Sequence, residues 1–385
     1  MEAGGNTDGS PLRILVAGQE DVSGYRTRPS RNSNLLFELD RRFHLVGSIR
    51  PDLTRLQSFA ARLRYPYPNR MGWRQRAGLN AWAFRRLTAE SERQLEQREA
   101  DYDVILMLQT LFSPSSDAER LPYTIYTDNI HTLTARHAPQ WAPFNARQRS
   151  ARIALEAATC RQAARIFAMS RFVRAALIDD YGCAAERVIH VGAGANSIAN
   201  SIEPKRYDSR IALFVGINFE LKGGSVLLRA WEQVRRQMPD AELWVVGPTP
   251  QAKQAKAEGV RWLGFVKERT ELARIYDEAS LFVLPSFYDA YPHALREAMG
   301  HGLPCVGTSA GGVPENIHVG ETGLLVEPGA PEPLADAIIS ILGDPEKARA
   351  MGHAGYEEVR REHTWERVGE RMAPHLEATA RERPL

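Results

Sequence analysis

The sequence predicts an α/β protein built from two Rossmann-like domains in series. Its 385 residues exceed what a single typical core accommodates. Short apolar runs alternate with amphipathic stretches along the whole chain, which is the pattern of parallel sheets covered by helices. Each half of the chain also opens with an apolar strand that runs into a glycine, at Gly18 and at Gly216.

The apolar runs define the expected strands in order. In the first half they cover residues 12–18, 44–49, 104–109, 124–127, 165–169 and 188–191. In the second half they cover residues 210–216, 242–247, 260–263, 281–285, 304–307 and 323–326. We expect one helix to begin near Pro292, because proline suits the first helical position, and a last helix to follow Thr364.

These elements divide the chain into five segments. Residues 1–11 are polar and glycine-rich and predict a disordered tail without a signal peptide. The first domain is expected over 12–196, a polar linker containing Pro204 over 197–208, and the second domain over 209–363. The final helix occupies 364–385.

The composition excludes several classes of protein. A net charge of +2 gives no reason to expect binding to nucleic acid. The three cysteines form no CxxC pair or metal-spaced cluster, which indicates reduced intracellular thiols. No apolar run reaches the ~20 residues that a membrane helix needs. The sequence therefore predicts a cytoplasmic protein, and only six of its residues are lysines, so Lys222 is easily singled out.

The segment 285–299 carries the strongest indication of function. Asp289 lies on a loop after an apolar strand, and Glu297 lies in the helix expected to begin near Pro292. A helix N-terminus offers unpaired N–H groups and a positive dipole to a diphosphate. Carboxylates accept hydrogen bonds from the hydroxyls of a sugar. This arrangement predicts a nucleotide-sugar site.

This segment resembles the donor-site signature of the retaining glycosyltransferases of family 4, which have the GT-B fold. The family pattern has two Glu separated by seven residues, and it corresponds here to Asp289 and Glu297. Ala298-Met299, Gly302-Leu303-Pro304 and the Gly311-Gly312-Val313-Pro314-Glu315 loop follow it. The resemblance implies two Rossmann-like domains facing across a cleft, with a C-terminal helix that crosses back to the N-terminal domain. It also implies a nucleoside-diphosphate sugar donor, with a UDP-sugar favoured, and no metal or other cofactor.

The resemblance assigns roles to residues of the second half. Lys222, in a glycine-rich loop after residues 210–216, would bind the donor diphosphate and stabilise it as it leaves. Asp289 would contact the donor sugar, and Glu297 would bind the ribose hydroxyls. The remaining donor-binding candidates act mainly through the backbone or near the base, and they are Gly216, Gly223, Ala290, Tyr291, Pro292, His293, Phe265 and Val266.

Two loops of the first half are candidates for the donor-sugar or acceptor side. Asp128 and His131 follow the strand expected at 124–127, and open α/β sheets bind ligands beyond the carboxyl ends of their strands. Tyr25 and Arg26 lie on the loop after the first strand. The alternative is ordinary turn chemistry for Asp128 and a structural role for His131.

The stretch 55–98 is rich in arginine and carries Trp73, Trp82 and Phe84. Such a stretch can contact a membrane surface or an anionic acceptor. The alternative is a solvated arginine face with the aromatic side chains in the core.

The resemblance therefore implies a retaining hexosyltransferase that acts on an unidentified acceptor: a glycan, a lipid, a natural product or a protein. The alternative enzyme is a nucleotide-sugar epimerase of the GT-B type. The alternative from another class is a degenerate nucleotide-binding partner subunit. Asp289 in place of Glu, and Ile217 where the family commonly has Arg, motivate that last hypothesis.

Overall fold

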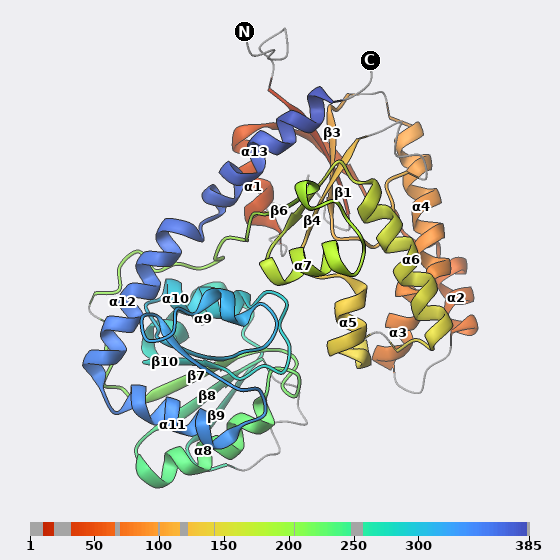
Figure 1. Ribbon diagram of the computed structural model, residues 1–385. Coiled ribbons are helices and arrows are strands. Elements are labelled where there is room, and N and C mark those ends of the chain that lie inside the picture. Colours follow the sequence, from red (N-terminus) through yellow and green to blue (C-terminus); the bar gives the residue numbers. More distant parts are fainter. Residues whose placement is uncertain are drawn as a thin grey trace. The chain divides into compact units, whose positions relative to one another are not determined.

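The computed structural model describes residues 11–18, 32–65, 70–98, 101–115, 122–141, 143–203, 205–247 and 257–382 (Figure 1). The chain forms two compact units. Unit 1 comprises Met1–Gly194 together with Trp365–Leu385, and unit 2 comprises Ala195–Thr364. Residues 1–10 of the expected tail lie outside the described ranges.

Unit 1 is built on a parallel sheet with the strand order β2-β1-β3-β4-β5-β6. The strands are β1 (Arg13–Ala17), β2 (His44–Ile49), β3 (Val104–Leu108), β4 (Tyr123–Thr127), β5 (Arg165–Ala168) and β6 (Val188–His190). The helices are α1 (Ser33–Arg42), α2 (Arg55–Arg64), α3 (Arg70–Leu79), α4 (Ala81–Glu96), α5 (His131–His137), α6 (Ala146–Gln162), α7 (Arg171–Asp179) and α13 (Trp365–Arg381), with short 3₁₀ turns η1 (Pro139–Trp141) and η2 (Ala185–Arg187).

The last helix, α13, belongs to unit 1 although its sequence follows unit 2. It packs against α1 and against strands β3, β4 and β5 (Figure 1). Its inward face buries Val368, Met372 and Leu376 completely. Its first residue lies so close to Gly194 that a Cβ there would meet the backbone nitrogen of Trp365 at 2.4 Å. The helix thus completes one face of the unit 1 sheet.

Unit 2 contains a second parallel sheet, with the strand order β12-β11-β10-β7-β8-β9. The strands are β7 (Ile211–Val215), β8 (Glu242–Val246), β9 (Val260–Gly264), β10 (Leu281–Leu284), β11 (Cys305–Thr308) and β12 (Gly323–Val326). The helices are α8 (Gly224–Gln237), α9 (Arg269–Glu278), α10 (His293–Gly300), α11 (Pro331–Leu342) and α12 (Pro345–Glu362), with the 3₁₀ turn η4 (Val313–Asn316).

The core of unit 2 lies on both faces of its sheet. On one face Trp231 of α8 and Ile338 of α11 pack against Leu243 and Val283. On the other face Tyr276 of α9 and Met299 of α10 pack against inward residues of the same strands. A sheet buried on both faces explains why its strands read as continuous apolar runs rather than as alternating patterns.

All twelve predicted strands are present in the described residues, with ends that differ from the predicted ones by at most one residue. Several of the overestimates fall on a glycine or proline just beyond the strand, such as Gly18, Gly216 and Pro285. Helix α10 begins at His293, and Pro292 precedes it with ψ 81°, so proline stands one position outside the helix instead of in its first turn.

The segment 197–208, expected as a linker, is part of unit 2. Ile198 lies against Gly300 and Ile202 against Gly302. The hydroxyl of Tyr207 donates to the carbonyl of Gly302 at 2.9 Å. The apolar side chains of Ile198 and Ile202 explain why this otherwise polar segment packs against the end of α10. Across the described residues, no helix combines the length and the apolar character needed to cross a membrane.

The position of α13 leads to a stability prediction. Replacing the fully buried Leu376 with alanine removes apolar contacts and leaves a cavity, so we expect a loss of about 2–5 kcal/mol in the free energy of unfolding. Urea denaturation of the whole chain measures it. The neighbouring exposed Glu377→Ala should change the same quantity by no more than about 0.5 kcal/mol. Equal effects of the two substitutions would show that α13 is not part of the unit 1 core.

Candidate functional site

The strand order of unit 2 reverses between β7 and β10. From β7 the chain proceeds to β8 and β9 on one side, and from β10 to β11 and β12 on the other. Ligands of open α/β sheets bind at such a switch point, beyond the carboxyl ends of the strands. The loop after β7 carries Lys222 and the loop after β10 carries Asp289, so the fold brings two predicted site residues to this point.

Lys222 and Asp289 form an ion pair. The Lys222 Nζ lies 2.5 Å from Asp289 Oδ2, and their side chains are 19% and 12% exposed. In a pair this sheltered from water, each charge compensates the other. The arrangement places a positive charge at the edge of the sheet, held by one oxygen of the Asp289 carboxylate.

The two loops meet because glycine permits it. Gly223 has φ +77°, and a Cβ there would lie 1.8 Å from the carbonyl oxygen of Pro285. The backbone N–H of Phe287 donates to the carbonyl of Leu221 at 3.0 Å, which joins the loops directly. No residue with a side chain fits at position 223 without separating Lys222 from Asp289.

The Gly311-Gly312 loop contacts the backbone of Asp289. A Cβ on Gly311, where φ is +58°, would lie 2.4 Å from the carbonyl oxygen of Asp289. The N–H of Gly312 donates to that oxygen at 2.8 Å. The predicted glycine loop therefore approaches the Asp289 backbone closely.

The expected backbone donors of the Asp289 loop are engaged within the loop. The N–H of Tyr291 donates to Asp289 Oδ1 at 3.3 Å, and the N–H of His293 donates to the carbonyl of Tyr291 at 3.0 Å. Ala290, Tyr291 and Pro292 are buried. These two N–H groups would have to exchange their present partners before they bound a phosphate.

Arg296 is a residue that sequence reasoning missed. It is 3% exposed, and its guanidinium lies over the Tyr291 ring, 4.5 Å from the centroid. Its Nε donates to Asn316 Oδ1 at 2.5 Å, and Asn316 Nδ2 donates to the carbonyl of Gly312 at 2.6 Å. Arg296 thus joins the Asp289 loop to the glycine loop. The only feature of the sequence that could have pointed to Arg296 is its position directly before Glu297.

Glu297 lies on α10 next to two hydrogen-bond donors. The Tyr276 hydroxyl donates to Glu297 Oε2 at 3.3 Å, and the Asn196 side chain also bonds to this carboxyl. Burial raises the pKa of Glu297, and the bonds from Asn196 and Tyr276 oppose that rise only in part. The carboxyl is therefore more easily protonated than an ordinary glutamate.

Three other residues of unit 2 are placed as follows. Phe265, just after β9, is 64% exposed, while Val266 packs against the core. Ile217, which directly follows Gly216, is 68% exposed. Phe265 and Ile217 thus present large apolar side chains to solvent beyond the strand ends.

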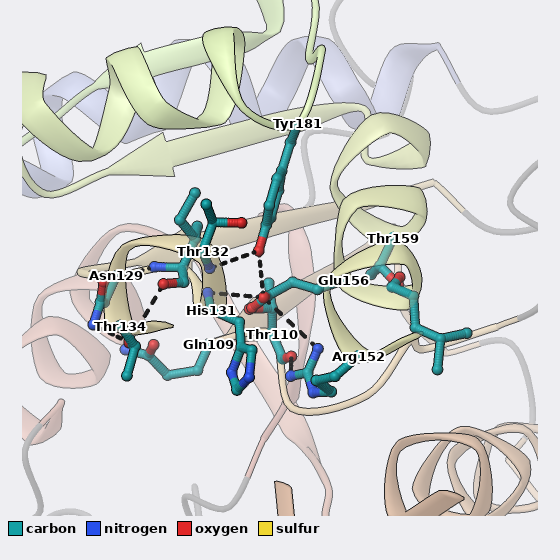
Figure 2. A network of polar contacts seen from close by, with 12 residues as sticks. Gln109, Thr110, Asn129, His131, Thr132, Thr134, Arg152, Glu156, Thr159 and Tyr181 are labelled. Carbon is teal, nitrogen blue, oxygen red and sulfur yellow. Dashed lines mark hydrogen bonds and ion pairs between the residues drawn. The ribbon is translucent and has the colours of Figure 1, made fainter. Parts of the chain in front are cut away.

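In unit 1 the strand order reverses between β1 and β3, and a polar network lies beyond the ends of β3 and β4 (Figure 2). Its centre is the carboxylate of Glu156 on α6, which is 3% exposed. It accepts hydrogen bonds from the hydroxyl of Thr110, from the backbone N–H of His131 at 2.9 Å and from the hydroxyl of Tyr181 at 2.6 Å. Arg152 Nη1 lies 3.7 Å away. Sequence reasoning did not single out Glu156.

This network fixes the start of α5 and with it His131. The His131 side chain is 8% exposed, and its Nε2 has no hydrogen-bond partner among the described residues. Burial lowers the pKa of His131 to about 4, against the weaker opposing effect of the Glu156 carboxylate. At neutral pH the structure therefore holds a neutral imidazole.

Asp128 lies beside the same network. Its Oδ1 accepts a hydrogen bond from Gln109 Nε2 at 2.9 Å. Gln109 follows β3 and has φ +72°, a conformation that is uncommon for a residue with a side chain. The other predicted residues of the first half, Tyr25 and Arg26, lie outside the described ranges.

The lowered pKa of His131 predicts a pH-dependent stability. Its ordinary pKa is 6.5, so the unfolded chain binds a proton between pH 6.5 and about 4 that the folded chain does not. The stability should be complete above pH 6.5 and should fall by about 2 kcal/mol by pH 5. Urea denaturation at pH 7.5 and pH 5 measures it, and His131→Asn should lack this component. The exposed His44→Asn serves as the control; parallel losses in wild type and His131→Asn would contradict the assignment.

Comparison with known proteins agrees with this architecture. The family model "Glycosyltransferase Family 4" matches residues 32–196, and "Glycosyl transferases group 1" matches residues 209–344. The structure of sucrose-phosphate synthase from Thermosynechococcus elongatus superposes with a TM-score of 0.69 at 18% identity, covering 94% of this chain and 98% of that one.

Two curated relatives match part of the chain. D-inositol 3-phosphate glycosyltransferase of Segniliparus rotundus is 32% identical over 186 residues, which are 45% of this chain and 40% of that protein. A GDP-mannose-dependent monoacylated alpha-(1-6)-phosphatidylinositol monomannoside mannosyltransferase of Corynebacterium glutamicum is 30% identical over 173 residues, 42% and 45% of the two chains. The chain thus spans less than half the length of these relatives. The two family models, the paired parallel sheets and the switch-point site together show that the chain belongs to the group 1, family 4 glycosyltransferases of the GT-B fold.

Proposed function

We propose that this protein is a retaining glycosyltransferase that moves a hexosyl group from a nucleoside-diphosphate sugar to an acceptor hydroxyl. The observation that carries the proposal is the Lys222–Asp289 pair at the switch point of unit 2. A diphosphate leaving group needs a fixed positive charge nearby, and the bonding of Lys222 to one carboxylate oxygen leaves its other protons available to phosphate.

In this proposal Glu297 accepts hydrogen bonds from the ribose hydroxyls of the donor nucleotide. Its carboxylate is already oriented by Tyr276 and Asn196, so it loses little freedom when it accepts hydrogen bonds from two sugar hydroxyls. Phe265 offers an exposed aromatic face for the base, with Val266 fixing its loop against the core.

In the proposed reaction the bond between the anomeric carbon and the diphosphate oxygen breaks, and a bond to the acceptor oxygen forms on the same face of the sugar. The acceptor proton passes to the departing diphosphate. Lys222 stabilises the charge that develops on that diphosphate, and Asp289 binds sugar hydroxyls through its second oxygen. Asp128 and the neutral His131 contribute hydrogen-bonding groups of unit 1 for the transferred sugar or the acceptor.

The donor is a UDP-sugar in this proposal, and GDP-mannose is the second candidate because one relative is named for it. The reaction requires no metal ion, so it should proceed in the presence of EDTA. Inositol 3-phosphate is the first acceptor to test, since the name of another relative contains it.

One prediction of the proposed reaction concerns Lys222. Lys222→Met removes the charge that stabilises the leaving group, and we expect kcat to fall about 100- to 1000-fold. The measurement is acceptor-dependent release of nucleoside diphosphate from UDP-glucose or GDP-mannose. Lys347→Met removes a lysine that bonds to Ser340 at the surface and should leave kcat unchanged. Full activity of Lys222→Met would overturn the assignment.

The same assay separates the alternatives. A transferase releases nucleoside diphosphate only when an acceptor is present, whereas an epimerase converts the donor without releasing it. A degenerate partner subunit binds nucleotide and turns over neither substrate. Each of the last two outcomes would refute the proposed transfer reaction.

Another prediction of the proposed reaction concerns Glu297. Titration calorimetry with UDP, GDP and ADP should show selective binding of one nucleotide, weakened about ten- to hundredfold in Glu297→Gln at pH 7.5. The pKa of Glu297 is raised above the ordinary glutamate value of 4.5. Acidification should therefore weaken nucleotide binding to the wild type at a higher pH than it would if Glu297 had that ordinary pKa. Glu297→Gln should lack that pH dependence, and the exposed Glu271→Gln should behave as wild type. Unchanged affinity in Glu297→Gln would remove it from the site.

A further inference from the structure

Helix α2 of unit 1 exposes large apolar side chains on one face. Leu56 is 82% exposed, Phe59 61% and Leu63 65%. Positions i, i+3 and i+7 lie on one side of a helix, so these three side chains form a continuous stripe, which we call the α2 face. Leucine and phenylalanine stripes normally face a core, and this one has no covering element in the described parts of the chain.

The rest of the helix is held so that this face points outward. Ala61, on the opposite side, is the buried residue of α2. The indole N–H of Trp73 on α3 donates to the carbonyl of Arg62 at 2.8 Å. The N-terminus is closed by a capping box between Thr54 and Gln57. These contacts fix the rotation of the helix about its axis, so the α2 face is a built feature of unit 1.

Positive charge borders the α2 face on both sides. With about 100° of rotation per residue, Arg55 and Arg62 fall along one edge of the stripe and Arg64 along the other. All three arginines are exposed. The sequence between Asp52 and Glu90 contains eight arginines and no aspartate or glutamate. This stretch is far more one-sided in charge than the chain as a whole, whose net charge is only +2.

We propose that the α2 face docks this protein onto an anionic lipid surface. Leu56, Phe59 and Leu63 enter the boundary between headgroups and acyl chains, and the bordering arginines remain at the level of the lipid phosphates. An amphipathic helix with an apolar stripe and a basic border is the form that lies in a membrane interface. A membrane rather than a protein partner is favoured by the absence of acidic residues over the whole stretch, because a protein surface is rarely uniformly acidic over such a length.

The expected strength can be stated as fold-changes. Each arginine close to an anionic surface increases partitioning by about fivefold. Loss of three arginines should therefore reduce binding by about a hundredfold at low salt, and added salt should weaken the wild type in the same direction. Loss of the three apolar side chains should reduce binding by a similar factor.

The test is flotation of the full-length protein with vesicles of phosphatidylcholine containing 30 mol% phosphatidylglycerol, against vesicles of phosphatidylcholine alone. We expect binding to the anionic vesicles only. The triple variant Leu56→Ser, Phe59→Ser, Leu63→Ser and the triple variant Arg55→Gln, Arg62→Gln, Arg64→Gln should both lose it. Val319→Ser in unit 2 removes an equally exposed apolar side chain (63%) and should bind as wild type.

A second readout locates the contact. The native cysteines Cys160, Cys183 and Cys305 are buried, so a polarity-sensitive dye can be attached selectively to Phe59→Cys or Val319→Cys. Vesicles should shift the emission of the dye at position 59 to the blue and leave that at 319 unchanged. Equal vesicle binding of wild type and the serine variant would overturn the proposal. The proposal would also be overturned if the wild type were a dimer, the serine variant a monomer, and both bound vesicles equally. That result would make the α2 face a contact between two copies of the chain.

Discussion

The ion pair of Lys222 and Asp289 is the interaction on which the proposed donor site depends. It links the two loops that begin where the strand order of unit 2 reverses, and it exists only because Gly223 lets one loop reach the backbone of the other. Around it, Gly312 and Arg296 hold the Asp289 loop from a third direction. Two charges sheltered from water and 2.5 Å apart tolerate little displacement, so the surrounding glycines and Arg296 determine the position of the pair in the proposed donor site.

In unit 1 a different set of contacts holds polar groups beyond the strand ends. A buried carboxylate, Glu156, collects three donors and thereby positions the start of α5. The cost of burying that charge is offset by its hydrogen bonds and by Arg152. The result is a histidine whose backbone is fixed and whose ring remains neutral in mildly acidic solution.

The strands were predictable because both sheets are buried on two faces, and a buried parallel strand is a short apolar run that needs no tertiary information to be recognised. Asp289 and Glu297 stood out in the sequence by their spacing, and Lys222 by its glycine-rich loop after a strand, while their roles in binding a donor stay predictions. Arg296 and Glu156 were not, because their roles arise from partners 20 or more residues away, such as Asn316, Thr110 and His131. The engagement of the Tyr291 and His293 N–H groups within their own loop was also beyond the sequence, since it depends on backbone angles near Pro292. The α2 face was visible only as an arginine-rich stretch, because exposure of Leu56 and Phe59 is a property of how α2 sits on α3.

The membership of α13 in unit 1 has a consequence for biosynthesis. A ribosome delivers residues 1–194 first, then the whole of unit 2, and only at the end the helix that buries one face of the unit 1 sheet. Until then the strands β3, β4 and β5 lack their partners Val368, Met372 and Leu376. The first unit to be translated is thus the last to be completed, and its nascent form exposes apolar surface for as long as synthesis of unit 2 takes.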